Sequence, residues 1–164
     1  GDTSVHEYPT SEQMAEMAIS AARVVRLFGF EPRVAFVSHS TFGQPLTSRT
    51  KHIKNAVEIL KEKNVNFEFD GDMQPDVALN VEYKNLYPFS KIVGNANILI
   101  MPGQHSAAIS YKMMKTLGDA KVIGPLLIGL GLPIEIAPLR SSTSEILNLA
   151  SVAAYSADII DYKK

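Results

Sequence analysis

The segment Glu31–Gly43 constrains the fold of this chain more than any other. Pro32 disfavours a helix just before it, and Arg33–Val37 is a short, apolar and partly β-branched run that predicts a buried strand. Hydroxyl side chains and a glycine follow at Ser38–Gly43, and a helical pattern begins near Ser48. A strand, a small polar loop and a helix in this order are typical of anion sites in α/β proteins. Because neither a P-loop nor a G-x-G-x-x-G motif is present, an ordinary turn is an equally open interpretation.

The rest of the chain alternates in the same way. Helical periodicity predicts helices at 11–28, 48–63, 75–86, 106–117 and 144–159, and apolar runs predict strands at 33–37, 67–69, 97–101, 122–132 and 133–136. This order predicts an α/β fold with helices on both faces of one sheet, in one domain over residues 10–164. Residues 1–9 are expected to be a disordered tail or a cloning scar.

The first predicted helix has a clear start and an apolar face. Thr10 and Gln13 form a capping box, and Gly29 supplies the stop. Its Ala and Met content favours close packing against another helix, either of this chain or of a partner. We therefore expect a homodimer, with the alternative that the same face covers the chain's own sheet.

Composition excludes several function classes. The chain has 16 Lys and Arg against 17 Asp and Glu, so no net field favours nucleic acid or an anionic membrane. It has no cysteine, which excludes disulfides, thiolate metal sites and a cysteine nucleophile, and indicates the cytoplasm. No apolar run reaches the ~18 residues of a membrane span, and no signal peptide is visible.

Charged residues form two candidate sites. Arg49, Lys51, His52 and Lys54 crowd the start of the second helix, where cations are unfavourable unless a polyanion binds. The alternative is a solvated basic face. Acidic side chains at Asp70-Gly71-Asp72 and at position 76 follow a strand, and predict either a divalent metal or general-base site or a turn. The four histidines lack zinc-ligand spacing, so no metal site is predicted from them.

Two further features lie toward the C-terminus. Gly124 and Gly129 interrupt an apolar region, and glycine is tolerated there where another backbone or a ligand comes close. Ser142 and Glu145 form a second capping box, so Glu145 is either a helix cap or a general base.

Four stretches in order carry a resemblance that spans about residues 10–160: PRVAFVSHSTFG, FDGDMQPDVAL, ANILIMPG followed by ISYKM, and VIGPLLIGLGLPIEI. Together they resemble the phosphotransacetylase family, the phosphate acetyl/butyryl transferases. The SHSTFG loop is most similar to the copy of this domain fused behind NADP-dependent malic enzymes. The resemblance implies a three-layer α/β/α sandwich of the isocitrate/isopropylmalate dehydrogenase type, as the second domain of a two-domain pair.

The resemblance also implies chemistry. Family members exchange acetyl-CoA and phosphate for acetyl phosphate and CoA, with a base that deprotonates the CoA thiol and with arginines and hydroxyls that hold the phosphate. The family's aspartate falls on Glu145, and its Ser-Arg pair falls on Pro138 and Leu139, so that Arg140 is one residue late. This slip of about 3 Å of chain predicts weak or lost acyl transfer.

Catalytic candidates are therefore Arg140 and Glu145. Candidates for binding acetyl-CoA, CoA or phosphate are Ser38, Ser40, Thr41, Gly43, Lys51, Lys54, Tyr111, Lys112, Gly124 and Gly129.

Three functions stay open. The first is the phosphotransacetylase-like domain of a malic enzyme that senses acetyl-CoA and assembles subunits, in which case NADP and a divalent metal would belong to a malic-enzyme domain outside this chain. The second is an active phosphate acetyltransferase. The third is an unrelated module for another phosphorylated ligand.

Overall fold

The structure, a computed structural model, describes residues 1–2, 4–118 and 121–159. It divides the chain into two units, Gly1–Tyr111 and Lys112–Lys164, where the sequence predicts one domain over residues 10–164. The boundary falls inside the helix α5 (Gln104–Leu117). No helix of the described residues is both long and apolar enough to cross a membrane.

A parallel three-stranded sheet forms the centre of the first unit. Its order is β2 (Glu68–Met73), β1 (Arg33–Val37) and β3 (Ile98–Ile100), and β1 pairs with both neighbours. β1 is buried at every position after Arg33, as expected for a strand that is covered on both faces. The predicted α/β fold is confirmed.

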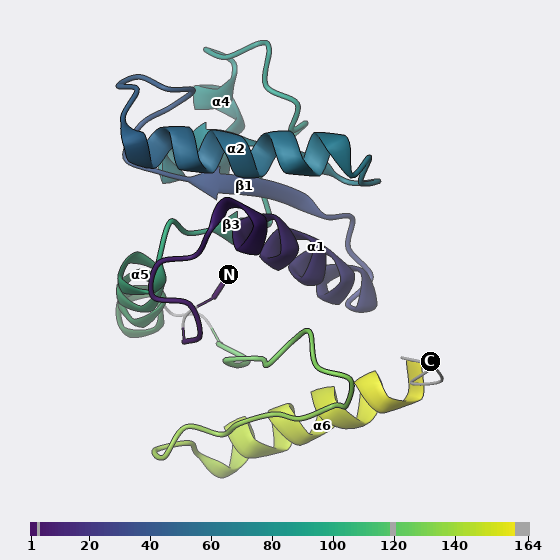
Figure 1. The fold of residues 1–164 in the computed structure, drawn as a ribbon. Helices are drawn as coiled ribbons and strands as arrows, with labels where there is room; N and C mark the ends of the chain where they lie inside the picture. Colours follow the sequence, from purple (N-terminus) through teal and green to yellow (C-terminus); the bar gives the residue numbers. More distant parts are fainter. Residues whose placement is uncertain (3, 119–120, 160–164) are drawn as a thin grey trace. The chain divides into compact units, whose positions relative to one another are not determined.

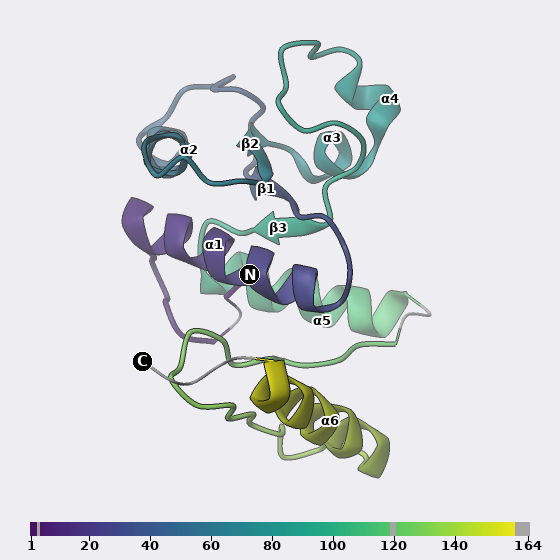
Figure 2. The same cartoon turned by 90° about the vertical axis from the view of Figure 1, so that its right-hand side faces the viewer.

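Two helices, α1 (Ser11–Leu27) and α2 (Ser48–Glu62), cover one face of this sheet, as Figures 1 and 2 show. Met14 and Ala18 of α1 pack with Ile53 of α2 and with Phe36 of β1 in one buried cluster. The Ala- and Met-rich face of α1 therefore covers the chain's own sheet, which was the alternative to a partner helix.

The other face is covered by α3 (Pro75–Leu79) and the segment before β3. Ala35 of β1 points to this side, whereas its neighbours Val34 and Phe36 point to α1 and α2, as the two-residue period of a strand requires. The three layers of the predicted sandwich are thus present. The helix predicted at 75–86 is two short helices, because Asn80 breaks it and its side chain accepts a hydrogen bond from Glu82 N (2.9 Å) at the start of α4 (Val81–Lys84).

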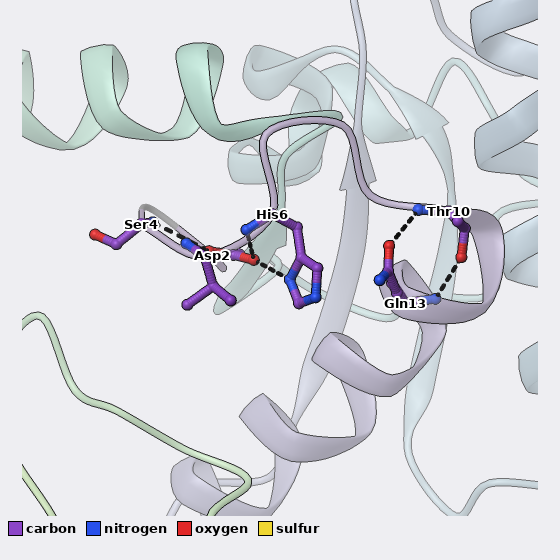
Figure 3. A network of polar contacts seen from close by, with 6 residues as sticks. Asp2, Ser4, His6, Thr10 and Gln13 are labelled. Carbon is purple, nitrogen blue, oxygen red and sulfur yellow. Dashed lines mark hydrogen bonds and ion pairs between the residues drawn. The ribbon is translucent and has the colours of Figure 1, made fainter.

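Both ends of α1 follow the sequence signals. Thr10 Oγ1 accepts from Gln13 N (3.2 Å), and Gln13 Oε1 accepts from Thr10 N (2.8 Å), so the capping box is confirmed (Figure 3). At the other end Gly29 has φ +81°, and Gly29 N and Phe30 N donate to Arg26 O (2.9 Å) and Val25 O (3.2 Å). This pair of bonds is a Schellman motif, which satisfies carbonyls at the end of the helix.

The segment before α1 differs from the expected disordered tail. Asp2 accepts hydrogen bonds from Ser4 N (3.0 Å), from His6 N (2.9 Å) and from His6 Nδ1 (2.6 Å), which Figure 3 shows in close-up. Glu7 O accepts from Gln104 N (3.2 Å) at the start of α5. These bonds give the described residues of the segment a defined path.

The second unit contains the end of α5, from Lys112, and the helix α6 (Thr143–Ile159). The strands predicted at 122–132 and 133–136 are wrong, since residues 121–138 contain no strand. The apolar side chains of these residues are typical of a buried strand, yet those of Ile123, Leu132 and Ile136 are 49%, 63% and 63% exposed. An apolar segment becomes a strand only when another strand satisfies its N–H and C=O groups, and residues 121–138 pair with none.

Candidate functional site

The loop between β1 and α2, residues 38–47, lies where β1 and its parallel neighbour β2 end. Ligands of open α/β sheets bind outside the carboxyl ends of the strands. The loop follows the strand that pairs with two neighbours, so it is anchored from the centre of the sheet. We define it as the β1–α2 loop and take it as the candidate site.

Asp72 of β2 holds this loop. Its carboxylate accepts hydrogen bonds from the hydroxyl of Ser40 and from Gly43 N (2.9 Å), and its carbonyl accepts from Phe42 N (2.6 Å). Asp72 is only 3% exposed, and a buried carboxylate requires such donors. The Ser40 hydroxyl, itself fully buried, is therefore used in the fold.

Ser38 and Thr41 of the loop are also buried. Ser38 N donates to Met73 O (2.9 Å), and Thr41 Oγ1 accepts from Gln74 N (3.2 Å). Gln74 Nε2 reaches back to His39 O (2.9 Å). The predicted hydroxyls of Ser38 and Ser40 thus lie within the loop, and those of Ser40 and Thr41 bond to Asp72 of β2 and to Gln74 just after it. The exposed side chain among these residues is that of His39.

The acidic side chains of FDGDMQPD accept hydrogen bonds from backbone N–H groups. Asp70 accepts from Lys91 N (2.7 Å) and Gly71 N (3.0 Å), and Asp76 accepts from Val77 N (3.0 Å). The predicted turn at 70–72 is however strand, because Asp70 and Gly71 pair with Ala35 and Phe36 of β1. The described residues contain no group of three His, Cys, Asp or Glu side chains that could hold a metal.

The start of α2 carries the basic cluster beside the loop. Thr47 and Thr50 form its capping box, and the first turn contains no acidic residue. Arg49, Lys51 and Lys54 are exposed, and none of the three forms an ion pair with another described residue.

His52 does not belong to this exposed group. Its Nε2 lies 2.8 Å from Pro9 O, and its Nδ1 lies 3.1 Å from Ser11 Oγ. Because a carbonyl oxygen only accepts, Nε2 carries a hydrogen and donates it to Pro9 O. His52 therefore ties α2 to the start of α1.

The remaining ligand-binding candidates lie on α5 and in the second unit. Tyr111 and Lys112 are consecutive on α5 at the boundary of the two units. Gly124 and Gly129 belong to the second unit and have φ of +128° and +88°, a region that suits glycine.

Glu145 of the second unit is a helix cap. Its Oε2 accepts from Ser142 N (2.8 Å) and Ser142 Oγ (3.0 Å), and its Oε1 accepts from Lys115 Nζ (2.7 Å). The hydrogen bond from Lys115, followed by those from Ser142, lowers the pKa of Glu145 to about 2. A carboxylate with this pKa is a weak base. The side chain of Arg140 is exposed and makes no ion pair with a described residue.

Sequence reasoning missed the role of Asp72 as the anchor of the loop. The sequence does contain two polar motifs at the ends of predicted strands, SHSTFG and DGD. It does not indicate which groups of the two motifs bond to each other. It also missed an open pocket lined by Arg23 and Arg26, for which the sequence offers no motif.

Relatives of the chain are found among both malic enzymes and acyltransferases. It is 47% identical to the NADP-dependent malic enzyme of Rhizobium meliloti, over 95% of this chain and 20% of that protein. It is 35% identical to the phosphate acetyltransferase of Clostridium acetobutylicum, over 95% of this chain and 47% of that protein. The chain therefore spans about a fifth to a half of these relatives.

The solved phosphotransacetylase from Streptococcus pyogenes has the same fold. Its TM-score to this chain is 0.91 at 31% identity, over 96% of this chain and 48% of that one. The model of the family described as phosphate acetyl/butaryl transferase matches residues 1–154. The chain belongs to the phosphate acetyl/butaryl transferase family, and its domain is of the phosphotransacetylase type that malic enzymes and phosphate acetyltransferases share.

Proposed function

We propose that this chain is the phosphotransacetylase-like part of an NADP-dependent malic enzyme, which decarboxylates malate oxidatively, and that it binds acetyl-CoA as an effector. Identity of 47% to a malic enzyme against 35% to a phosphate acetyltransferase supports this choice of parent. In such a parent, NADP and a divalent metal act in a domain outside this chain.

The observation that carries the ligand proposal is the unpaired basic cluster at the start of α2. Arg49, Lys51 and Lys54 lie on the first two turns, next to the anchored β1–α2 loop. The phosphates of CoA supply the negative charge that this end of a helix favours. We propose that Lys51 and Lys54 contact these phosphates.

Three features support the proposal that acyl transfer is weak or lost. The hydroxyl of Ser40 is used to hold Asp72, so it is not available to a phosphate. Glu145, with a pKa of about 2, would be a poor base for a CoA thiol. Arg140 is one residue away from the position that the resemblance implies.

Replacing Lys51 and Lys54 together by alanine tests the ligand site. Charge-assisted contacts contribute about 1.5–3 kcal/mol each when partly shielded, so acetyl-CoA should bind at least about tenfold more weakly. Calorimetry at two salt concentrations measures this, with Lys61→Ala/Lys63→Ala as a control that removes two charges from the other end of α2. Equal affinity of the wild type and the Lys51/Lys54 variant would show that the cluster is a solvated face.

An active phosphate acetyltransferase is the second candidate, favoured by the TM-score of 0.91 to a solved phosphotransacetylase. The two candidates differ in turnover. We expect no appreciable acetyl phosphate synthesis from acetyl-CoA by the full-length parent in a coupled thiol-release assay. Turnover of ~10 per second, a median enzyme rate, would establish the transferase instead. An unrelated phospho-ligand module has no support once the family is known.

A further inference from the structure

An open pocket of about 390 Å³ lies in the first unit between α1 and the connection from α2 to β2. We define it as the arginine pocket. Arg23 and Arg26 of α1 line one side, and Asn66, Val65 and Phe67 line the other. This volume is within the range of small-molecule sites.

The polar lining of the arginine pocket consists of two arginines and two asparagines, Arg23, Arg26, Asn64 and Asn66. Arg26 uses two of its five N–H donors, from Nη1 to Asn66 Oδ1 (2.9 Å) and from Nη2 to Asn66 O (2.7 Å). Arg23 makes no hydrogen bond or ion pair with another described residue. No acidic residue lines the pocket.

A purely structural role explains only part of this arrangement. Basic residues favour the C-terminal end of a helix, and Arg26 joins α1 to the loop before β2. This accounts for Arg26, whereas Arg23 is exposed and makes no such contact. Like charges three residues apart on a helix repel each other, and an anion between them removes that repulsion.

The apolar part of the lining limits the class of ligand further. Ile19, Val65 and Phe67 are half-buried, so each presents some apolar surface to the pocket. A bare inorganic ion would leave this surface in contact with water. A ring or short apolar chain would cover it.

We propose that the arginine pocket binds a small organic anion. Its carboxylate or phosphate lies against Arg23 and the remaining donors of Arg26, and its apolar body lies on Val65 and Phe67. This site is separate from the basic cluster at the start of α2.

Amide chemical shifts of the 164-residue chain test this proposal. We titrate the protein with inorganic phosphate, phenyl phosphate and benzoate and follow the amides of residues 64–67. The two phenyl compounds should give saturating shifts and bind about tenfold more tightly than inorganic phosphate. Saturation by phenyl phosphate alone identifies a phosphate monoester as the ligand class, and saturation by benzoate alone identifies a carboxylate.

Two variants locate the site. Arg23→Gln should weaken binding about tenfold and should change the amide shifts of the free protein only close to residue 23, since Arg23 makes no hydrogen bond or ion pair with another described residue. Lys61→Gln, which removes one charge from outside the pocket, should leave binding unchanged, as should the Lys51/Lys54 double variant. No saturable shift up to about 10 mM probe, equal binding by Arg23→Gln, or loss of binding in the Lys51/Lys54 variant would each overturn the proposal.

Discussion

Asp72 decides the geometry of the candidate site at the scale of single residues. One carboxylate, 3% exposed, accepts from the Ser40 hydroxyl and from Gly43 N, and so fastens the β1–α2 loop to β2. The preceding residue, Gly71, is also constrained, by its backbone conformation and by a close contact. Its backbone has φ +156° and runs against Phe36 of β1.

Gly71→Ala should destabilise the chain by about 2–4 kcal/mol. The added Cβ would lie 2.7 Å from Phe36 Cβ and 2.8 Å from Phe36 O, distances that force the two strands apart. Gly29→Ala is the matched control, because Gly29 also has positive φ (+81°) but an added Cβ meets nothing within 4 Å. It should cost only about 1 kcal/mol. Urea unfolding followed by circular dichroism measures both, and equal losses would refute the crowding at Phe36.

Among the helices, the start of α6 is also held by a single carboxylate, that of Glu145. Glu145 caps the helix with Ser142 and also binds Lys115 in the last turn of α5. One side chain thus links the last turn of α5 to the first turn of α6. Because both carboxylate oxygens of Glu145 already accept hydrogen bonds, these contacts favour a role as a helix cap over a role as a general base.

The carboxyl group of Glu145 should titrate with a pKa of about 2 when its carboxyl carbon is followed by NMR. Since the pKa is lower in the folded chain than the ordinary value of 4.5, the stabilisation by this carboxylate is complete above about pH 4.5 and is lost as the pH falls through about 2. Amide exchange in the first turn of α6 should therefore rise only at the acid end of this range. Glu145→Gln should abolish that pH dependence, because glutamine keeps the cap but does not titrate. A measured value near 4.5 would show that neither contact persists in solution.

At the scale of the whole molecule, the two units differ in how they bury apolar residues. The first unit has two closed clusters on the two faces of its sheet. In the second unit, large apolar side chains of residues 121–139 are exposed, among them Leu130, Leu132 and Ile136. Exposed apolar surface of this extent is typical of an interface.

We propose that the 164-residue chain is a homodimer whose contacts lie on the apolar segment 121–139. The Ala- and Met-rich face of α1 packs against the chain's own sheet and is therefore not exposed to a partner. Light scattering at tens of micromolar should give twice the monomer mass of 17.9 kDa. Leu132→Asp should shift the chain toward monomer, because a buried unpaired carboxylate is costly. Leu46→Asp, at an exposed position in the first unit (67%), is the control. A monomer at that concentration would contradict the proposal.

Sequence alone determined the features that depend on neighbouring residues. Capping boxes at Thr10 and Ser142 involve groups three residues apart, and the burial of β1 follows from its own apolar run. The order of strands and helices then left few α/β arrangements. The family resemblance rested on the same local stretches, and the match over residues 1–154 confirms it.

Tertiary structure decided what depends on residues far apart in the chain. The hydroxyl of Ser40 faces Asp72, 32 residues away, and Arg26 meets Asn66, 40 residues away. No local pattern states which of several hydroxyls, carboxylates and guanidinium groups will meet. The same reason explains β2, which continues through Asp70-Gly71-Asp72 because β1 pairs with it, and residues 121–138, which are apolar enough for strands but have no strand to pair with. A strand is a property of two segments, and the sequence of one segment cannot supply the other.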